Sequence, residues 1–485
     1  QDTSKIQHAI LRLLAAAHRN IFMVGDEDQS IYGFRAAWPQ ALLEFESTYP
    51  GAKVLLMETN YRSTRAIVER ADAFIQRNQN RHAKHMRTDN PPGETIRKIT
   101  LGDYNRQYNY LLKVARDCQK STAVLFRNND SALPLIDLLD REGVPYSCRQ
   151  REGFFFSSPI VRDLTDMLNF AYDDCNRDAF LRFYYKLDLK MKRTVLAGLL
   201  RYQREGESVF AALLGSDSLE PWQMGKVKVL QTHFSKLPQL TSFAALQRIV
   251  RFMGYGDYLK EQRSDTGKLD ILLALANQTP ELGPFLLRLQ DLRGLVEQGV
   301  SSPDCPFLLS TIHGSKGLEY DRVLLIDVMD GVFPSVEEPR GGDELSAEDQ
   351  AALEEERRLF YVGVTRAKHQ LEVLTYGMKF GEASGAYSTF VTQLLGEEKQ
   401  VAPPPQAQRS ALVGRPVPTA QQVAAWAKDY IPGAEVTHKV FGRGTLISLV
   451  GNIATIDFYE LHMKKVDLTA CLQKDLIRLT YFVGP

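Results

Sequence analysis

Apolar and polar positions alternate in blocks along the first 150 residues, in the manner of an α/β protein. The apolar residues of the first segment recur at helical spacing, at Ile6, Ile10, Leu13 and Leu14. The run "NIFMVG" over 20–25 then predicts a buried strand. A second strand is expected from "AKVLLMET" over 52–59, followed by a helix for which Ser63 or Thr64 is a candidate N-cap.

Strand and helix patterns repeat once more before the character of the chain changes. "TAVLF" over 122–126 predicts a strand, and "LPLIDLLDREG" over 133–143 predicts a helix. From 154 to about 299 the pattern is almost wholly helical. Strand character returns with "FLLSTIHGSKGLEYDRVLLIDV" from 307, and "EEERRLFYVGVTRAKHQLEVLTY" adds a helix, a loop and a strand. We therefore expect a sheet that is interrupted near residue 150 by a helical insertion and resumes after residue 305.

The carboxyl-terminal part has a different pattern. Residues 397–429 contain "APPPQ" and "RPVPTAQQ", which is the composition of a linker. Beyond them, short alternating segments broken by glycines predict a small β-barrel. Gly442 and Gly444 can be explained by a tight hairpin alone.

Composition narrows the function classes. The 485 residues contain no apolar run long enough to span a membrane and begin with no signal-like segment, so we expect a cytoplasmic protein with no membrane partner. Lysine plus arginine equal aspartate plus glutamate at 59 each, so any polyanion site must be local. Five cysteines without CxxC pairs or nearby histidines argue against zinc and against a disulfide framework, and no metal ligand is assigned.

Four motifs occur in a characteristic order. They are "GDEDQSIYGFR" (25–35), "NYRS" (60–63), "TIHGSKGLEYDRV" (311–323) and "EERRLFYVGVTRAK" (355–368). In sequence and order they resemble motifs III, IV, V and VI of the UvrD/Rep/PcrA family of superfamily 1A DNA helicases. Together with intervening segments such as "VPYSCRQREGFFF", the resemblance covers nearly the whole chain.

The resemblance implies an α/β fold with RecA-like P-loop helicase motor domains. It assigns residues 1–56 to a remnant of the first motor domain (1A), 57–150 and 305–396 to the second (2A), 151–304 to a helical insertion (2B), 397–429 to a linker, and 430–485 to a Tudor- or SH3-like β-barrel.

The resemblance also implies a nucleotide site. Gln29, Arg62 and Arg366 are the catalytic candidates: both arginines would reach the γ-phosphate of ATP, and Gln29 would link it to the DNA-binding loop. Tyr61 would stack on adenine and Glu319 would accept from the ribose hydroxyl. The forked donors of arginine suit phosphate geometry. Taken alone, either arginine could be a surface ion pair, and Tyr61 an ordinary half-buried aromatic.

A DNA site is implied next to the nucleotide site. Its candidates are Tyr32, Phe34, Arg35, Arg127, Asn129, His313 and Lys316. Flat aromatic faces stack on bases without regard to sequence, a contact worth roughly 1 to 3 kcal/mol per base. Phe34 departs from the tryptophan frequent in the family. Arg35 could pair with the DNA backbone or with a neighbouring acid, and Lys316 could be merely solvated.

The chain departs from the family pattern in two places, and each departure changes the activity that we expect of these 485 residues. No GxxxxGK[ST] loop occurs in the 485 residues, and "QDTS" at the start resembles the tail of the family's Asp-Glu motif. We therefore expect a carboxyl-terminal portion that alone neither hydrolyses ATP nor unwinds DNA. The insertion's "YYKLDLKMKRTVL" lacks the glycine turn that grips a duplex in relatives. Basic residues there could supply phosphate charge or form a solvated helix face: Lys186, Lys190, Lys192 and Arg193.

The function expected for the intact protein is that of an ATP-dependent 3′-to-5′ DNA helicase or translocase in repair or replication. ATP and Mg²⁺ would be its cofactors, with the main magnesium and phosphate-loop ligands outside these residues. Single-stranded DNA and single-strand/duplex junctions would be its substrates, and RNA polymerase or a repair factor could bind the barrel. A non-catalytic DNA- or RNA-polymerase-binding accessory is the first alternative. The motor subunit of a helicase-nuclease ranks third, because no nuclease-like acidic and lysine cluster is recognisable.

Overall fold

The structure is a computed structural model in which the chain divides into two compact units, residues 1–399 and 400–485, described here one at a time. The described residues are 1–148, 153–187, 189–299, 302, 304–336, 345–384, 387–397, 430, 435–439, 442–458, 462–473 and 476–479.

A six-stranded parallel sheet organises the first unit. Its strands are β1 (Arg97–Leu101), β2 (Thr122–Phe126), β3 (Ser147–Cys148), β4 (Phe307–Thr311), β5 (Tyr320–Leu325) and β6 (Ala367–Tyr376). Their spatial order is β1-β6-β5-β2-β4-β3, and every pairing is parallel. Strands that precede residue 150 and strands that follow residue 305 therefore interleave in one sheet.

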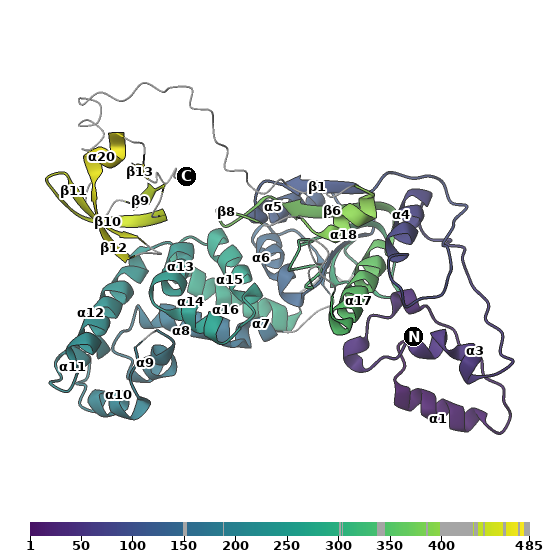
Figure 1. Cartoon of the computed structure of the whole chain (residues 1–485), viewed down its shortest axis with the longest axis horizontal. Coiled ribbons are helices and arrows are strands. Elements are labelled where there is room, and N and C mark those ends of the chain that lie inside the picture. The colour runs from purple at the N-terminus through teal and green to yellow at the C-terminus, as the bar shows by residue number, and fades with distance from the viewer. Residues whose placement is uncertain are drawn as a thin grey trace. The chain divides into compact units, whose positions relative to one another are not determined.

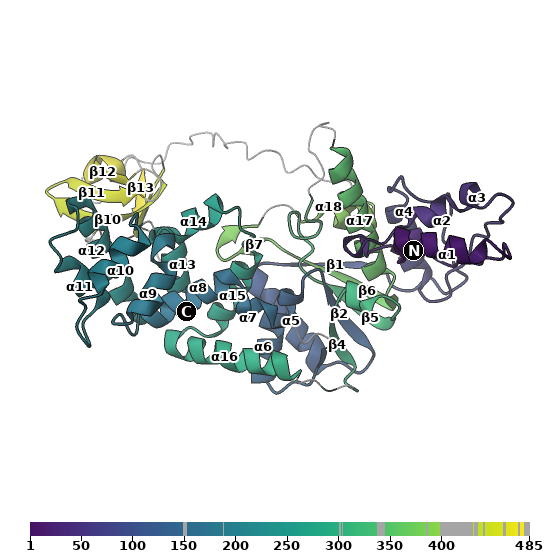
Figure 2. The same ribbon diagram turned by 90° about the horizontal axis from the view of Figure 1, so that it is seen from below.

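Helices cover both faces of this sheet (Figure 1 and Figure 2). One face packs on α5 (Tyr104–Arg116) and α6 (Leu133–Arg141), and the other on α4 (Arg65–Ile75), α17 (Ala347–Val364) and α18 (Thr389–Leu395). All five residues of β2 are buried. Val124 lies in the core of the first face and Leu125 in that of the second, because successive side chains of a strand point to opposite faces. An apolar run buried on both faces is typical of a parallel sheet.

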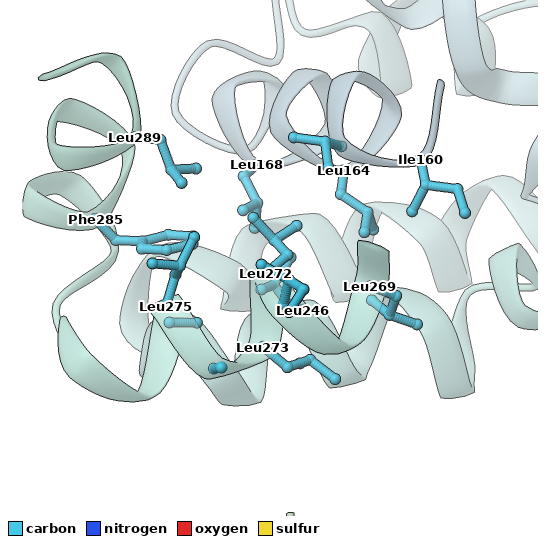
Figure 3. Close-up of a cluster of buried hydrophobic side chains, with 14 of the residues drawn as sticks. Ile160, Leu164, Leu168, Leu246, Leu269, Leu272, Leu273, Leu275, Phe285 and Leu289 are labelled. Atoms are coloured by element: carbon cyan, nitrogen blue, oxygen red, sulfur yellow. The ribbon is translucent and has the colours of Figure 1, made fainter. Parts of the chain in front are cut away.

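Between β3 and β4 the chain is helical. Its helices are α7 (Phe154–Ser157), α8 (Pro159–Phe170), α9 (Arg177–Phe183), α10 (Arg193–Leu200), α11 (Val209–Leu214), α12 (Pro221–Lys236), α13 (Ser242–Phe252), α14 (Tyr255–Glu261), α15 (Gly267–Gln278) and α16 (Leu282–Gln298). Figure 3 shows leucines of α8, α13 and α15 pointing toward one another, with Phe285 of α16 beside them. The described residues of 153–299 form no strand, as the pattern predicted.

The first 60 residues differ from the prediction. The helix expected at the start is present as α1 (Lys5–Ala15), capped by Ser4, and is followed by α2 (Gln40–Leu43) and α3 (Phe45–Thr48). The strands expected over 20–25 and 52–59 are wrong, because both stretches are irregular. Phe22 is 87% exposed and Leu55 is 84% exposed. A buried strand needs neighbouring strands for its backbone hydrogen bonds, and no described residue forms a ladder with either stretch.

Short elements complete the first unit. They are η1 (Glu27–Gln29), η2 (Gly33–Arg35), η3 (Asn129–Ala132), η4 (Tyr184–Lys186), η5 (Leu237–Gln239), η6 (His313–Ser315), β7 (Met378–Lys379) and β8 (Glu382–Ala383). In the described part of the chain, no helix combines the length and apolar character that crossing a membrane requires.

The second unit contains an antiparallel sheet of order β12-β11-β10-β9-β13. Its elements are β9 (Glu435–His438), β10 (Gly442–Val450), β11 (Ile453–Phe458), β12 (His462–Asp467), α20 (Leu468–Gln473) and β13 (Ile477–Leu479). Leu446, Ile456 and Leu472 contribute to a small apolar core. Gly451 has φ +60° in the turn between β10 and β11, a conformation that suits glycine. Among the described residues β12 and β13 are the edge strands and do not pair, so the closed barrel expected from the sequence is not formed by these strands.

Candidate functional site

Two 3₁₀ turns shape the loop over residues 26–35. Asp26 is the N-cap of η1, and its carboxylate accepts from the backbone N–H of Asp28 at 3.1 Å. Ile31 is buried in the core under α17 and fixes the middle of the loop. The backbone N–H of Gly33 donates to Glu355 Oε1 of α17 at 3.0 Å, and a Cβ at this position would lie 2.6 Å from that oxygen. The sequence thus holds Gln29 and the aromatic residues on either side of one buried anchor.

Arg366, just before β6, is a fully buried arginine with neutral partners. It is 1% exposed, and it donates to two backbone carbonyl oxygens at 2.9 and 3.0 Å. Its Nη2 donates to Thr365 Oγ1 at 3.1 Å and to Gln29 Oε1 at 3.3 Å. No carboxylate within the described ranges forms an ion pair with it. Burial and the nearby Arg62 lower the pKa of Arg366 to about 10, so the group stays charged at neutral pH. A buried charge without a counter-ion is costly, so this position suits an incoming anion.

Arg62 lies beside the same turn but is partly exposed. Its Nη1 donates to the Thr365 carbonyl oxygen at 3.2 Å, and its Nε donates to Glu319 Oε2 at 2.7 Å. Lys368 pairs with the other oxygen of Glu319 at 2.7 Å. Hydrogen bonds from Lys368 and Arg62 lower the pKa of Glu319 to about 2. Arg62 thus forms an ion pair, which was the alternative interpretation of this residue. Its partner is Glu319, the residue expected to bind the ribose.

The "NYRS" turn is held by the side chain of Asn60. Its Oδ1 accepts from the backbone N–H groups of Arg62 and Ser63, both at 2.9 Å. Thr64 is the N-cap of α4 by position, but its side chain makes no capping hydrogen bond. Tyr61 is 81% exposed, which contradicts the half-buried alternative, and with Arg62 it lines a cavity of about 770 Å³.

A second cavity, also of about 770 Å³, brings together most of the predicted DNA residues. Those that line it are Tyr32, Phe34, Arg35, Arg127, Asn129 and His313. They come from the loop over 26–35, from the segment after β2 and from η6 after β4. The segments after β2 and β4 converge because the carboxyl ends of these paired parallel strands meet at one edge of the sheet, and the loop over 26–35 packs beside them. We call this cavity the strand groove.

Aromatic rings form one wall of the strand groove. The rings of Tyr32, Phe34 and His313 contact one another with centroids 5.5 to 6.0 Å apart. Phe34 is 68% exposed, so one face is open. The Arg35 guanidinium lies 5.3 Å from the centroid of the Tyr32 ring and 5.4 Å from that of Phe34. Arg35 therefore packs against these rings, and no carboxylate in the described part of the chain forms an ion pair with it; a contact with the DNA backbone stays a prediction.

Other predicted contacts are held by protein groups. Arg127 donates to Glu356 Oε1 through Nε at 3.0 Å and Nη2 at 2.9 Å. Burial and Arg127 lower the pKa of His313 to about 4, so its ring is neutral at pH 7. Lys316 does not line the strand groove.

Lys316 is instead tied to the loop over 26–35. Its Nζ donates to both carboxylate oxygens of Asp2 at 2.7 Å and to the Gln29 carbonyl at 2.8 Å. Its ammonium also lies 5.0 Å from the centroid of the Tyr32 ring. Lys316 is therefore not the merely solvated lysine of its alternative interpretation.

The acidic run that precedes Gln29 binds a lysine. Lys84 Nζ lies 2.7 Å from Asp26 Oδ1, 3.0 Å from Glu27 Oε1 and 3.3 Å from Asp28 Oδ2. Arg81 forms a forked pair with Asp28, through Nε at 3.0 Å and Nη2 at 2.9 Å. The three carboxylates are close enough to bind a metal ion, but the ammonium already takes the position that a cation would need. The cluster does not fit Mg²⁺ in this arrangement.

The basic residues of the helical insertion divide into two kinds. Lys186 is buried and its Nζ lies 2.7 Å from both carboxylate oxygens of Asp163, so it is neither solvated nor open to a phosphate. Lys190, Lys192 and Arg193 are exposed.

Sequence comparison assigns the chain to a family. The profile described as "UvrD-like helicase C-terminal domain" matches residues 55–220 and 236–377, more than half of the chain. The chain belongs to the UvrD-like helicase family. The profile described as "UvrD/REP helicase N-terminal domain" matches residues 1–50 of this UvrD-like chain.

Individual relatives agree with the profile. The chain is 30% identical over 418 residues to YjcD of Bacillus subtilis, named as a candidate ATP-dependent DNA helicase, covering 82% of this chain and 54% of YjcD. It is 26% identical over 486 residues to the ATP-dependent DNA helicase PcrA of Staphylococcus epidermidis, covering 92% and 64%. It is 27% identical over 486 residues to DNA helicase II of Escherichia coli, covering 93% and 65%. The UvrD-like chain thus spans between about half and two thirds of the length of these relatives.

Sequence reasoning missed several residues that build the site. Asn60 and Glu355 lie within the quoted motifs but were given no role, and Lys84 lies outside them; all three hold candidate residues in place. The three adjacent acids over 26–28 predict that a cation lies nearby, because three neighbouring carboxylates repel one another. They do not say which of 59 lysines and arginines supplies it.

Proposed function

We propose that this chain is part of an ATP-dependent DNA helicase or translocase, and that residues 1–56, 57–150 with 305–396, and 151–304 correspond to its domains 1A, 2A and 2B. The observation that carries the proposal is the Arg366 guanidinium, buried among neutral oxygens and 3.3 Å from Gln29. An arginine in a dry site can stabilise the charge that develops on a transferring phosphoryl group, worth about 10³ to 10⁵ in rate.

The residues present fit the phosphate end of a nucleotide. Arg366 and Arg62 converge on Thr365 from two sides, and Gln29 contacts Arg366 directly. ATP supplies the phosphoanhydride bond whose hydrolysis drives such motors. Arg366 would bind the terminal phosphate, and Arg62 would exchange its bond to Glu319 for a phosphate oxygen. Tyr61 would carry the base on its exposed ring.

The strand groove would bind single-stranded DNA. Phe34 offers an exposed ring, and Tyr32 and His313 contact it in edge-to-face arrangements. Gln29 and Phe34 lie five residues apart on one loop, so a shift at the phosphate end is passed to the base-stacking end. We extend the proposal to 3′-to-5′ polarity and to junction substrates by analogy with the family. The open sheet over 435–479 would be a Tudor-like module that binds a protein such as RNA polymerase or a repair factor.

The decisive experiment is ATP turnover by the complete product of the gene and by this 485-residue chain, each with and without oligo(dT). Because the 485 residues contain no phosphate loop, we expect turnover only from the complete product, and faster turnover with DNA. A complete product that binds oligo(dT) but never hydrolyses ATP would instead establish a non-catalytic accessory. Turnover by the 485-residue chain alone would show that its nucleotide site is completed in another way.

A further inference from the structure

We propose that Lys84 is a positioning residue for Gln29, acting through Asp26, and that it sets which end of the Gln29 carboxamide faces Arg366. The inference rests on the proposed function, in which Arg366 binds the terminal phosphate and Gln29 contacts Arg366. Four groups form a continuous chain of contacts, from the Lys84 ammonium through the Asp26 carboxylate and the Gln29 carboxamide to the Arg366 guanidinium.

The orientation of the carboxamide follows from the chemistry at its two ends. Asp26 Oδ2 lies 2.7 Å from Gln29 Nε2, and a carboxylate can only accept. Arg366 Nη2 lies 3.3 Å from Gln29 Oε1, and a guanidinium can only donate. Both neighbours therefore require the same orientation. If Asp26 turned away, only the longer 3.3 Å contact with Arg366 would hold the carboxamide in this orientation.

Lys84 holds the Asp26 carboxylate in place together with the backbone N–H of Asp28. Its shortest contact in the acidic cluster is the one to Asp26, at 2.7 Å. Arg81 binds Asp28 through three hydrogen bonds, and among the described contacts it makes no hydrogen bond or ion pair with Asp26. Asp26 itself is partly exposed, with 28% of its side chain accessible, so it could rotate toward water without this partner.

The contact also joins two parts of the chain that the proposed function places on different motor domains. Asp26 lies in the segment over 1–56, whereas Lys84 follows α4. Lys84 is 7% exposed, and its ammonium is surrounded by carboxylates of the other segment. A closing motion between the domains would therefore alter the Gln29 orientation through Lys84 as well as through Arg366.

The test uses steady-state ATP turnover of the complete gene product, with and without saturating oligo(dT). Lys84→Met should reduce DNA-stimulated kcat by about 10-fold to 100-fold, the size expected for a misoriented catalytic group, with little change in oligo(dT) affinity. Lys84→Arg should retain most of the stimulation. Gln29→Ala and the Gln29→Ala/Lys84→Met double variant should be equally impaired, since Lys84 has no amide left to position. Lys186→Met, which also removes a buried ion-paired lysine, is the matched control and should keep DNA stimulation.

Stimulation by DNA within twofold of wild type in Lys84→Met would overturn the inference, and so would a double variant impaired by the product of the two single effects. If the wild-type protein shows no DNA-stimulated ATP turnover, the proposed function is wrong. A second readout then still decides about Lys84: the side-chain NH₂ signal of Gln29 in the 485-residue chain, identified by its loss in Gln29→Ala. Its hydrogen exchange should be slowed in wild type and fast in Lys84→Met, and equal rates would refute the positioning role.

Discussion

Replacing Arg366 with methionine should separate activity from stability. Burial and the nearby Arg62 lower the pKa of Arg366 from its ordinary value to about 10 on folding, so holding the charge in the folded protein costs about 3 kcal/mol. Because folding lowers this pKa, the full cost is present below pH 10, and stability rises as pH increases above 10 toward the ordinary pKa of arginine. Methionine removes that cost. It also leaves the Leu318 carbonyl without its donor at 3.0 Å, which costs about 1 to 3 kcal/mol.

These two terms nearly cancel, so Arg366→Met should change the free energy of unfolding by less than about 2 kcal/mol. The turnover of the complete gene product should fall by about 10³-fold or more. Urea unfolding of the 485-residue chain, followed by tryptophan fluorescence, measures the first quantity, and coupled-enzyme ATP turnover measures the second. Turnover within tenfold of wild type would refute the assignment of Arg366. A loss of more than about 4 kcal/mol would show that the guanidinium has a structural role instead.

Three further predictions test the strand groove and the acidic cluster. Phe34→Ala should weaken oligo(dT) binding by about 1 to 3 kcal/mol in fluorescence anisotropy, and Phe34→Trp should not; equal affinities would mean that the open ring does not stack. NMR titration should place the pKa of His313 near 4, so its stabilising contribution is present above pH 6.5 and is lost as pH falls toward 4; a midpoint at or above 6.5 would contradict the burial argument. Arg81→Leu removes the buried partner of Asp28 and should lower the free energy of unfolding by about 3 to 5 kcal/mol. Arg116→Leu, which breaks an exposed pair with Glu142, should lower it by under about 1 kcal/mol. Equal losses would show that burial of the Arg81–Asp28 pair adds nothing to its contribution to stability.

Much of the fold was predictable because the apolar pattern is unambiguous where elements are fully buried. The five buried residues of β2 and the return of strand character after residue 305 identified the sheet. The same reasoning failed over 20–25 and 52–59, because an apolar run signals only a tendency to pair. Whether neighbouring strands are present is a tertiary fact that the run itself does not contain.

The candidate site was predictable to the level of motifs but not of contacts. The motif order brought Gln29, Arg62 and Arg366 to the same place, and the structure has Gln29 and Arg366 in contact. Motif position could not show that Arg62 pairs with Glu319 while Arg366 has no acid partner in the described part of the chain. That difference depends on burial, which is set by elements distant in sequence. The role of Lys84 could not be predicted for the same reason, since it lies 58 positions along the chain from Asp26.

The order of strands in the sheet constrains how the chain can fold as it leaves the ribosome. Among the described strands β1 pairs only with β6, the last strand of this sheet to be synthesised, although β1 itself ends at Leu101. At a synthesis rate of about 5 to 20 residues per second, the edge of β1 waits roughly 15 to 55 s for its partner. During that interval the helices of 153–299, whose contacts are mostly local, emerge and can fold. We expect nascent chains that end before residue 367 to be the species that chaperones must protect, because their unpaired strand edges are open to aggregation.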